Sequence, residues 1–464
     1  MSARRLVVIG GGIAGLAAAH RLLERARGTA EVVLLEASAR TGGAIATEYV
    51  DGFTIELGAD SFLAEKPWLG ALCERLGIAD RLIGTAPGER RTHVVFNGQL
   101  HPLPDGFLML APTRLWPLAF SPLFSWAGKL RMALDLVLPR RRDDSDETLA
   151  AFVERRLGRE ALDRAADPLV SGIYTADPAL LSLNATMPRF VEMEREHRSL
   201  ILGLRANARS RGETAKGSGA RYALFQSHVR GMGGLVQDIT DKLPAGVVRL
   251  QTRVDALTRA NDDWHLRIAG ERLRADAVII ATPAYETARL LRPLDAALAD
   301  DLESIRHASS ATVTLSFPSS AVGTLPGFGF VVPFVERRQL IACTFASRKF
   351  PGRAPAGWEL LRCFLGGARQ PEVANLADAE LIAIARRELA QLLNISGEPG
   401  IARVTRWTNA MPQYSVEHLA RVGRIERATA ALPGLALAGN AYRGVGVPDC
   451  VRSGEQAADD VSGV

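Results

Sequence analysis

A glycine-rich turn between an apolar run and an alanine-rich stretch most strongly limits how this chain can fold. Residues 5–9, with the sequence RLVVI, have the pattern of a buried strand. Gly10, Gly12 and Gly15 follow this run directly and open a helical pattern. The first glycine permits a tight turn, the second lets the backbone approach a pyrophosphate, and the third allows close helix packing. A second apolar run ends at Glu36, 21 residues beyond Gly15, so the spacing predicts a dinucleotide-binding fold.

Glu36 also narrows the kind of dinucleotide. A carboxylate at this position accepts a hydrogen bond from a free ribose hydroxyl, whereas it repels a 2′-phosphate. The pyrophosphate would face the N-terminus of the predicted helix, where unpaired backbone N–H groups attract an anion. The pattern therefore favours FAD or NAD over NADP.

Three further glycine clusters favour FAD over NAD. They are RTGG at 40–43, GADS at 58–61 and GNAYRGVG at 439–446. Each cluster alone is typical of an ordinary turn, but together and in this order they predict several loops that reach one cofactor. The last cluster lies between an apolar run and a helical pattern, where it can bring backbone donors to a flavin ring.

Longer motifs extend over nearly the whole chain. They include GGGIAGLAAA at 10–19, NGQLHPLPDG at 97–106, SGIYTADPALLSL at 171–183, GFGFVVP at 327–333, CTFASRKFPGRAP at 343–355, NAMPQYSVEHL at 409–419 and GNAYRGVGVPDC at 439–450. Together these motifs resemble the FAD-dependent porphyrinogen oxidases, which oxidise protoporphyrinogen IX or coproporphyrinogen III in haem synthesis. The GVGVPDC and MPQY segments separate this family from monoamine oxidases and carotene desaturases, which share only the general flavin fold.

The resemblance implies an α/β fold in which a Rossmann-type FAD-binding domain is assembled from discontinuous segments. It adds a mixed-sheet substrate domain and a helical, membrane-associating lobe. The expected boundaries are FAD-binding segments at 1–88, 225–300 and 406–464, the helical lobe at 89–210 and the substrate domain at 301–405. Periodicity alone predicts only an α/β flavoprotein with insertions.

FAD is the implied cofactor, and because the flavin accepts the hydride, no protein residue is assigned a catalytic role. The expected FAD contacts come from the glycine loops and from Val254. They are Gly10, Gly11, Gly12, Ile13, Ala14, Gly15, Glu36, Ala37, Arg40, Gly42, Gly43, Ala44, Gly58, Ala59, Asp60, Ser61, Val254, Gly439, Asn440, Val445, Gly446 and Val447.

The resemblance also assigns a clamp for the substrate. Phe328 and Val331 are expected to sandwich the macrocycle, and the backbone of Gly172 is expected to approach a pyrrole nitrogen. Phe330 lies on the same predicted strand and is included among the substrate contacts. Without the resemblance, the two phenylalanines are equally typical of core packing.

Propionates on the substrate require cations near the mouth of the pocket. Some family members have an arginine just before the NGQLHPLP motif, but Thr92 stands there in this chain, so Arg91 is the nearest candidate. Lys66, after GADSFLAE, is the alternative. Asp60 is expected to touch the macrocycle or steer a proton, although capping of its own turn is an equally good explanation.

A porphyrinogen loses six electrons when it becomes a porphyrin, and a flavin accepts two at a time, so three flavin cycles are needed. Molecular oxygen or another acceptor would reoxidise the flavin. We give preference to protoporphyrinogen IX, with coproporphyrinogen III as the alternative. An FAD oxidase acting on amines or polyenes, and a non-catalytic flavin or porphyrin carrier, are more remote hypotheses.

Composition excludes several other classes of partner. The net charge of +5 is modest, and arginines are dispersed among acids without a basic arm or an aromatic RNA-binding pattern, so no nucleic acid is expected. The four cysteines form no C-x-x-C pair and the eight histidines have no ligand spacing, so we expect buried free thiols and no metal. For Cys450, packing is favoured over flavin contact.

We expect a cytoplasmic protein, because no secretory signal precedes the first strand and no apolar run reaches 18 residues. The nearest approach is 107–138, a proline-broken apolar segment followed by a basic cluster at 140–142. Such a segment suits peripheral contact with the inner membrane surface, or it covers a substrate pocket. Both interpretations of this segment stay open. Whether the protein forms a homodimer is also left open.

Overall fold

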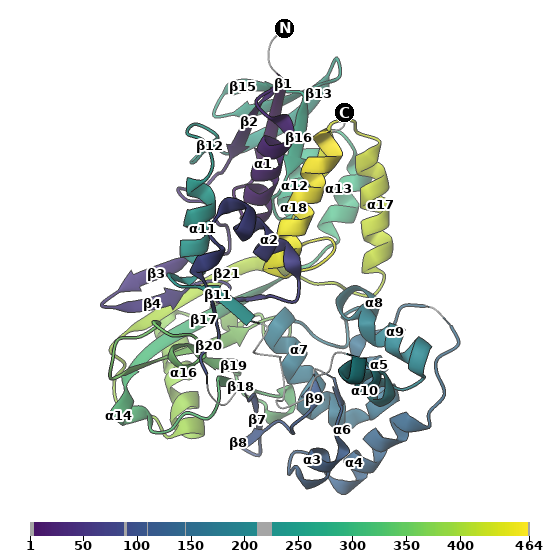
Figure 1. Ribbon diagram of the computed structural model, residues 1–464, viewed down its shortest axis with the longest axis vertical. Coiled ribbons are helices and arrows are strands. Elements are labelled where there is room, and N and C mark those ends of the chain that lie inside the picture. Colours follow the sequence, from purple (N-terminus) through teal and green to yellow (C-terminus); the bar gives the residue numbers. More distant parts are fainter. Residues whose placement is uncertain (1–3, 88–90, 109, 144, 211–224, 463–464) are drawn as a thin grey trace.

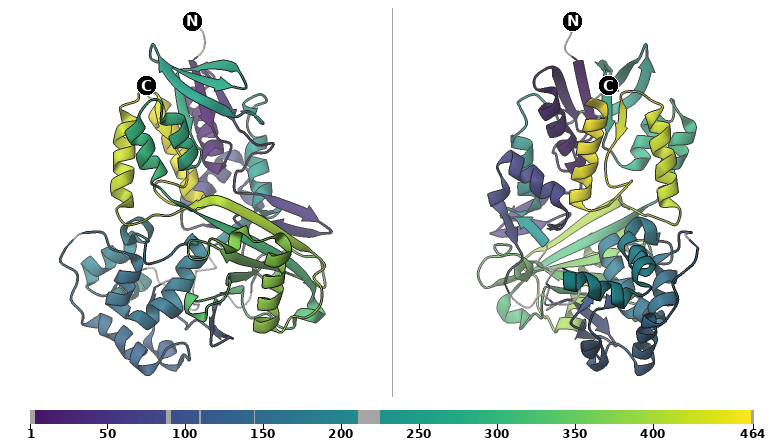
Figure 2. Two further views of the ribbon diagram at one scale, coloured as in Figure 1. Left: turned by 180° about the vertical axis from the view of Figure 1, so that it is seen from behind. Right: turned by 45° about the vertical axis from the view of Figure 1, so that its right-hand side comes forward.

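The computed structural model describes residues 4–87, 91–108, 110–143, 145–210 and 225–462, arranged in three regions (Figure 1). A parallel-sheet domain carries both ends of the chain. A larger mixed sheet lies beneath it, and a lobe of helices lies beside that sheet. Figure 2 shows from two further sides that the helical lobe lies at the end of the molecule away from both termini.

A five-stranded parallel sheet forms the centre of the first region. Its order is β12 (Val248–Arg249), β2 (Ala30–Leu35), β1 (Arg4–Ile9), β16 (Ala277–Ile280) and β22 (Leu435–Leu437). Every neighbouring pair is parallel. The strands are nearly continuous apolar runs because both faces of the sheet are covered. Side chains such as Val8 and Leu34 pack on one face, and Val7 and Val33 pack on the other.

Helices cover one face of this sheet and a mixed layer covers the other. The first layer holds α1 (Ile13–Ala26), α2 (Pro67–Leu76), α11 (Gly231–Asp241) and α18 (Val447–Ser462). The second holds β13 (Val254–Ala260), β14 (Asp263–Ile268), β15 (Glu271–Ala275), α12 (Ala284–Leu291), α13 (Ala296–Glu303) and α17 (His418–Ala430). These two layers bury both faces of the sheet. The loops at the carboxyl ends of its strands remain free to form a site.

The second region is a seven-stranded sheet. Its order is β21 (Ala402–Pro412), β17 (His307–Pro318), β20 (Trp358–Gly366), β19 (Leu340–Phe345), β18 (Gly329–Val331), β7 (His93–Phe96) and β8 (Gln99–Pro102). Only β18 and β7 pair in parallel. Helix α16 (Asp378–Leu393) packs on one face. Strands β7 and β8 were expected in the helical lobe at 89–210, but pairing with β18 places them in this sheet.

The third region is the helical lobe. It contains α3 (Leu115–Phe120), α4 (Trp126–Ala133), α5 (Leu149–Leu157), α6 (Arg159–Ala161), α7 (Asp167–Tyr174), α8 (Leu183–Thr186), α9 (Pro188–His197) and α10 (Leu200–Ser210). A π-helical turn at Leu162–Ala166 leads into α7. The lobe has its own apolar core, which also takes in Val94 of β7.

Short elements lie between the regions or within them. They are β3 (Thr47–Val50), β4 (Phe53–Glu56), β5 (Phe62–Leu63), β6 (Leu82–Gly84), β9 (Phe107–Leu108), β10 (Ala111–Pro112), β11 (Phe225–His228), α14 (Ser319–Val322) and α15 (Ala346–Lys349). The turn after β4 carries Gly58, and α15 carries a buried lysine, Lys349. These two connections bring the parallel-sheet domain against the mixed sheet.

A fully buried ion pair holds the helical lobe together. Arg156 of α5 donates through Nε to Asp135 Oδ1 at 2.7 Å and through its terminal nitrogens to the carbonyls of Pro139 and Arg198. The second carboxylate oxygen of Asp135 accepts from Ser199 Oγ at 2.6 Å. Both charged side chains are inaccessible to solvent. Removal of one member would leave the other charge buried without compensation.

We expect Arg156→Met to lower the free energy of unfolding by about 3–5 kcal/mol, because it strands the Asp135 carboxylate in the lobe core. Arg386→Met is the matched control, since Arg386 pairs with the exposed Glu398 on the surface. Its cost should stay within about 1 kcal/mol. Urea unfolding of both variants checks this, and equal losses would contradict a structural role for the buried pair.

Candidate functional site

The first glycine turn has the geometry that its sequence predicts. Gly10 has a φ of +107°, and a Cβ there would lie 2.7 Å from the carbonyl oxygen of Ala281. A Cβ on Gly15 would lie only 1.9 Å from the carbonyl oxygen of Gly10. By contrast, a Cβ on Gly12 would meet no atom within 4 Å. Gly10 and Gly15 therefore allow close packing, whereas Gly12 borders free space at the N-terminus of α1.

Glu36 lies directly beside this turn. One carboxylate oxygen accepts from the backbone N–H of Gly11 at 2.6 Å, and the other accepts from the backbone and side chain of Ser38 at 2.7 Å. The next residue is Ala37, and the backbone of Thr252 donates to the carbonyl of Glu36, two residues before Val254 begins β13. The acid is thus fixed next to the glycine turn, as a ribose-binding carboxylate requires.

The second loop, residues 40–44, packs against the first. The backbone N–H of Gly42 donates to the carbonyl of Gly11 at 2.8 Å. The Arg40 guanidinium donates to the carbonyls of Thr41, Gly43 and Ile45 at 2.8–3.0 Å. Arg40 is one of the expected FAD contacts, and in the structure its terminal nitrogens donate to carbonyls of its own loop. The donors that face the first turn are backbone groups.

The third loop, residues 57–61, approaches the second so closely that a Cβ on Gly58 would lie 1.6 Å from the carbonyl oxygen of Ala44. Its Asp60 carboxylate accepts from Lys349 Nζ at 2.8 Å and from Ser61 Oγ at 2.7 Å. Burial opposes ionisation of Asp60, but the charges of Lys349 and Arg362 outweigh it and lower its pKa to about 2. The Asp60 carboxylate is therefore held in an ion pair with Lys349, and its contact with the macrocycle or with a proton stays a prediction.

The last loop, residues 439–446, leads from β22 into α18. Gly439 and Gly444 both have φ near +130°. Asp449, in the first turn of α18, accepts from the backbone N–H of Gly446 at 3.2 Å and from Lys66 Nζ at 2.5 Å. Lys66 was expected to hold a substrate propionate, but the structure pairs its ammonium with Asp449 beside this loop.

These four loops fit FAD. They leave open space at Gly12, offer backbone N–H groups at a helix N-terminus and hold an acid near them. The terminal loop carries Asn440 and Val445, and Val447 begins α18 directly after it, so these expected contacts stay predictions. When FAD is bound, it supplies the hydride acceptor, and the glycine loops bind and orient it.

The expected substrate contacts divide into a pair that face each other, Gly172 and Val331, and two buried phenylalanines, Phe328 and Phe330. A Cβ on Gly172 would lie 3.7 Å from Val331 Cγ1, so α7 and β18 face each other at these positions. Phe330 is 2% exposed and packs edge-on against Phe345 in the sheet core. This corrects the expectation for Phe330, because strand alternation turns it away from Val331. Phe328 is buried just before β18.

Arg91 precedes β7, whose His93 and Val94 pair with Phe330 and Val331 of β18. It pairs with Asp105 at 3.7 Å, and both side chains are more than two-fifths exposed. Lys66, the other candidate for a propionate contact, pairs with Asp449.

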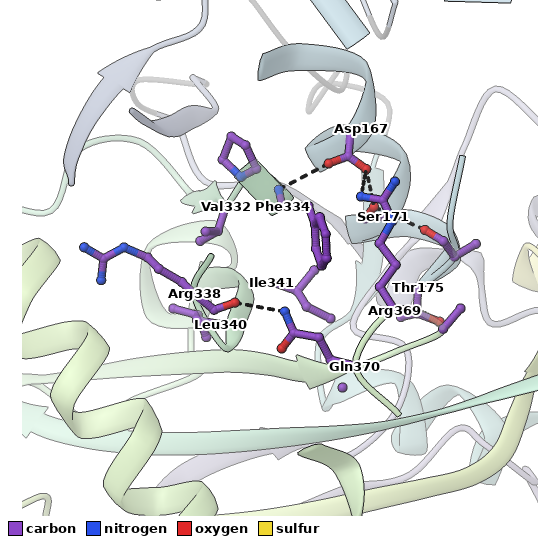
Figure 3. Close-up of a pocket in the computed structure, with 14 residues that line it drawn as sticks. Asp167, Ser171, Thr175, Val332, Phe334, Arg338, Leu340, Ile341, Arg369 and Gln370 are labelled. Carbon is purple, nitrogen blue, oxygen red and sulfur yellow. Dashed lines mark hydrogen bonds and ion pairs between the residues drawn. The ribbon is translucent and has the colours of Figure 1, made fainter. Parts of the chain in front are cut away.

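Charged side chains tie α7 to the mixed sheet around a small pocket of about 30 Å³ (Figure 3). Arg369 donates to Asp167 at 2.8 Å and to Asp177 at 2.7 Å, and its guanidinium lies 4.6 Å from the Phe334 ring centroid. The backbone N–H of Phe334 donates to the other oxygen of Asp167. The helix that carries Gly172 is therefore held at a fixed place over the sheet, a role that no local sequence pattern indicates.

Comparisons with known proteins decide the family. The family described as flavin containing amine oxidoreductase matches residues 13–462. The coproporphyrinogen III oxidase of Bacillus subtilis (strain 168) is 37% identical over 98% of this chain and 97% of its own length. The chain belongs to the family of flavin containing amine oxidoreductases. It is an FAD-dependent oxidoreductase of the porphyrinogen oxidase group.

Two further proteins support the same assignment. The chloroplastic protoporphyrinogen oxidase of Nicotiana tabacum is 28% identical over 98% of this chain and 85% of its own length. A crystal structure of a putative protoporphyrinogen oxidase from Exiguobacterium sp. 255-15 superimposes with a TM-score of 0.88 at 31% identity. It covers 100% of this chain and 99% of its own. The α/β fold is thus that of an FAD enzyme over the full chain.

The described residues contain no group of three or more histidine, cysteine or acidic side chains that could hold a metal. All four cysteines are free and buried, as expected. Burial raises the pKa of the Cys450 thiol to about 12. Cys450 therefore stays protonated and packs in the core beside α1.

Gly12→Glu should yield a folded protein without flavin. The added side chain would point into free space, so the fold tolerates it, while it occupies room that the pyrophosphate needs and repels its charge. Visible absorbance of the purified protein measures flavin content, and circular dichroism measures the fold.

Gly15→Ala provides the contrast, because its Cβ would collide with the Gly10 carbonyl and should lower the melting temperature of the whole protein. Full flavin content in Gly12→Glu would contradict the assigned cofactor site.

Proposed function

We propose that this protein oxidises coproporphyrinogen III to coproporphyrin III with FAD as cofactor. The observation that carries the proposal is the 37% identity to the Bacillus subtilis coproporphyrinogen III oxidase along almost the full length of both chains, against 28% to the Nicotiana tabacum protoporphyrinogen oxidase. This reverses the preference for protoporphyrinogen IX that the sequence analysis favoured. Protoporphyrinogen IX becomes the alternative substrate.

The geometry supports a reaction in which the protein positions the reactants and does not attack them. The substrate gives up six electrons in three two-electron steps, for which FAD would supply the hydride acceptor while one proton leaves the substrate in each step. Gly172 and Val331 face each other where α7 meets the mixed sheet, and the ion pairs of Arg369 hold that helix in place. Oxygen or another acceptor would then take the electrons from the flavin.

The two candidate substrates differ at two edge groups, which are propionates in coproporphyrinogen III and vinyls in protoporphyrinogen IX. A site for the former needs cations that remain free to bind carboxylates. Arg91 is partly exposed and its pair with Asp105 is long, at 3.7 Å. We therefore assign Arg91 rather than Lys66 as the first candidate for a propionate contact.

Aerobic incubation with each porphyrinogen, followed by porphyrin fluorescence, tests the substrate. We expect kcat/KM for coproporphyrinogen III to exceed that for protoporphyrinogen IX at least tenfold, a difference of about 1.4 kcal/mol in transition-state stabilisation. The flavin-free Gly12→Glu variant supplies the spontaneous rate. A higher kcat/KM for protoporphyrinogen IX would overturn the substrate assignment, and oxidation of neither above that rate would overturn the function.

We further propose that the helical lobe contacts a membrane surface. Trp116, Phe120 and Trp126 are 77%, 79% and 69% exposed, and Leu130 and Val137 are also exposed. A pocket cover would bury such side chains, so their exposure favours contact with lipid over that alternative. In the described part of the chain, no helix is long and apolar enough to cross a bilayer. The contact would therefore lie in the plane of the interface.

The charge around this apolar surface supports an anionic lipid. Lys129 Nζ lies 4.6 Å from the Trp126 ring centroid, and Arg140 and Arg142 are exposed just beyond Val137. Aromatic rings at the headgroup level and nearby cations are the features that bind an amphipathic surface to such lipids.

A Trp116→Ser, Trp126→Ser double variant should lose most binding to vesicles with anionic lipid while it keeps its activity on soluble substrate. The lost aromatic area and the loss of interfacial anchors explain the expected change. Cosedimentation with vesicles measures it. Leu250→Ser, which alters an exposed apolar residue of the parallel-sheet domain, is the control and should bind like the unmodified protein. If the unmodified protein stays in the supernatant, the lobe does not contact membranes.

A further inference from the structure

Two stacked aromatic side chains, Tyr414 and His418, support the terminal glycine loop, residues 439–446. Tyr414 follows β21 in the MPQY segment and is 2% exposed, and His418 begins α17 with no exposed surface. Their ring centroids are 3.9 Å apart with planes at 13°. The pair therefore forms one rigid unit between the mixed sheet and the parallel-sheet domain.

This unit makes hydrogen bonds to alternate residues of the loop. Tyr414 Oη donates to the carbonyl of Asn440 at 2.6 Å and accepts from the backbone N–H of Gly444 at 2.9 Å. His418 Nε2 lies 2.8 Å from the carbonyl of Tyr442, to which it donates. Because the loop has no helix or strand of its own, these side chains satisfy backbone groups that would otherwise lack partners.

The chemistry of both groups keeps these bonds in place. Burial lowers the pKa of His418 to about 4, so its imidazole stays neutral and carries a proton on one nitrogen. Burial raises the pKa of Tyr414 well above its usual range, so its hydroxyl stays protonated. The donor and acceptor roles are therefore fixed at physiological pH.

The backbone of Tyr414 is bonded to the helical lobe. Its carbonyl accepts from the backbone N–H of Ser182 at 2.8 Å, just before α8. The neighbouring Gln413 donates through Nε2 to the carbonyl of Tyr174 at the end of α7, at 3.2 Å. Gln413 and Tyr414 together thus connect the helix that carries Gly172, the end of the mixed sheet and the glycine loop.

We propose that Tyr414 is a positioning residue that, with His418, sets the conformation of the flavin-contacting loop and, with Gln413, links it to the helical lobe. FAD is the cofactor of this enzyme, and the inference rests on the proposed contact between residues 439–446 and the flavin. It does not depend on which porphyrinogen is oxidised.

Tyr414→Phe is the direct test, because it keeps the ring and its stacking on His418 but removes both hydrogen bonds to the loop. We expect FAD to leave the holoprotein about tenfold faster than from the unmodified protein, corresponding to about 1.4 kcal/mol. Free FAD fluorescence after dilution follows the release. We also expect a shift of the visible flavin absorption band, which a merely structural hydroxyl would leave unchanged.

Thr429→Val is the matched control. Its buried hydroxyl donates to the carbonyl of Ile425 on the same helix α17 and does not touch the loop. This variant should lose some thermal stability but keep the normal rate of FAD release and the normal spectrum.

Two variants of His418, His418→Gln and His418→Leu, distinguish the effect of its hydrogen bond to the loop from the effect of its packing. Glutamine keeps a donor for Tyr442 and should release FAD more slowly than leucine.

Unchanged FAD release and an unchanged flavin spectrum in Tyr414→Phe would overturn the inference. So would an equal change in Thr429→Val, since a general loss of stability would then explain the result. Neither measurement uses a porphyrinogen. The results therefore test the role of Tyr414 independently of which substrate the enzyme oxidises.

Discussion

The close approach of helix α1 to its neighbours is the constraint on which the whole site depends. A Cβ on Gly15 would lie 1.9 Å from the carbonyl oxygen of Gly10, and one on Gly454 of α18 would lie 2.0 Å from that of Ala14. No other residue fits these two positions, since backbone cannot give way as a flexible side chain does. The helix N-terminus is therefore fixed at the end of β1, and the remaining glycine loops pack around it.

Charge pairs then determine how the other parts meet this centre. Lys349 reaches Asp60 from the mixed sheet, Lys66 reaches Asp449 beside the terminal loop, and Arg369 joins two acids of the helical lobe. Each pair connects segments that lie far apart in the chain. Two of these cations join different regions of the fold, and Lys66 joins two segments of the parallel-sheet domain.

The sequence was sufficient where chemistry depends on neighbours in the chain. The strand, glycine turn, helix and acid at 4–36 were all predicted, because spacing within one βαβ unit fixes their geometry. The sequence was insufficient where the interaction partner of a residue lies far away in the chain. Asp60 and Lys349 are separated by 289 positions, and nothing local indicates their pairing. The same limit hid the entry of β7 into the mixed sheet and the contacts of Tyr414.

The most direct test of the central claim is to mix the holoprotein with limiting coproporphyrinogen III in the absence of oxygen. Visible absorbance then follows the flavin, and fluorescence follows the porphyrin. If this FAD enzyme oxidises the substrate in two-electron steps, three flavins should lose their absorbance for each coproporphyrin formed. Porphyrin formation without loss of flavin absorbance, or no change in either signal, would contradict the account.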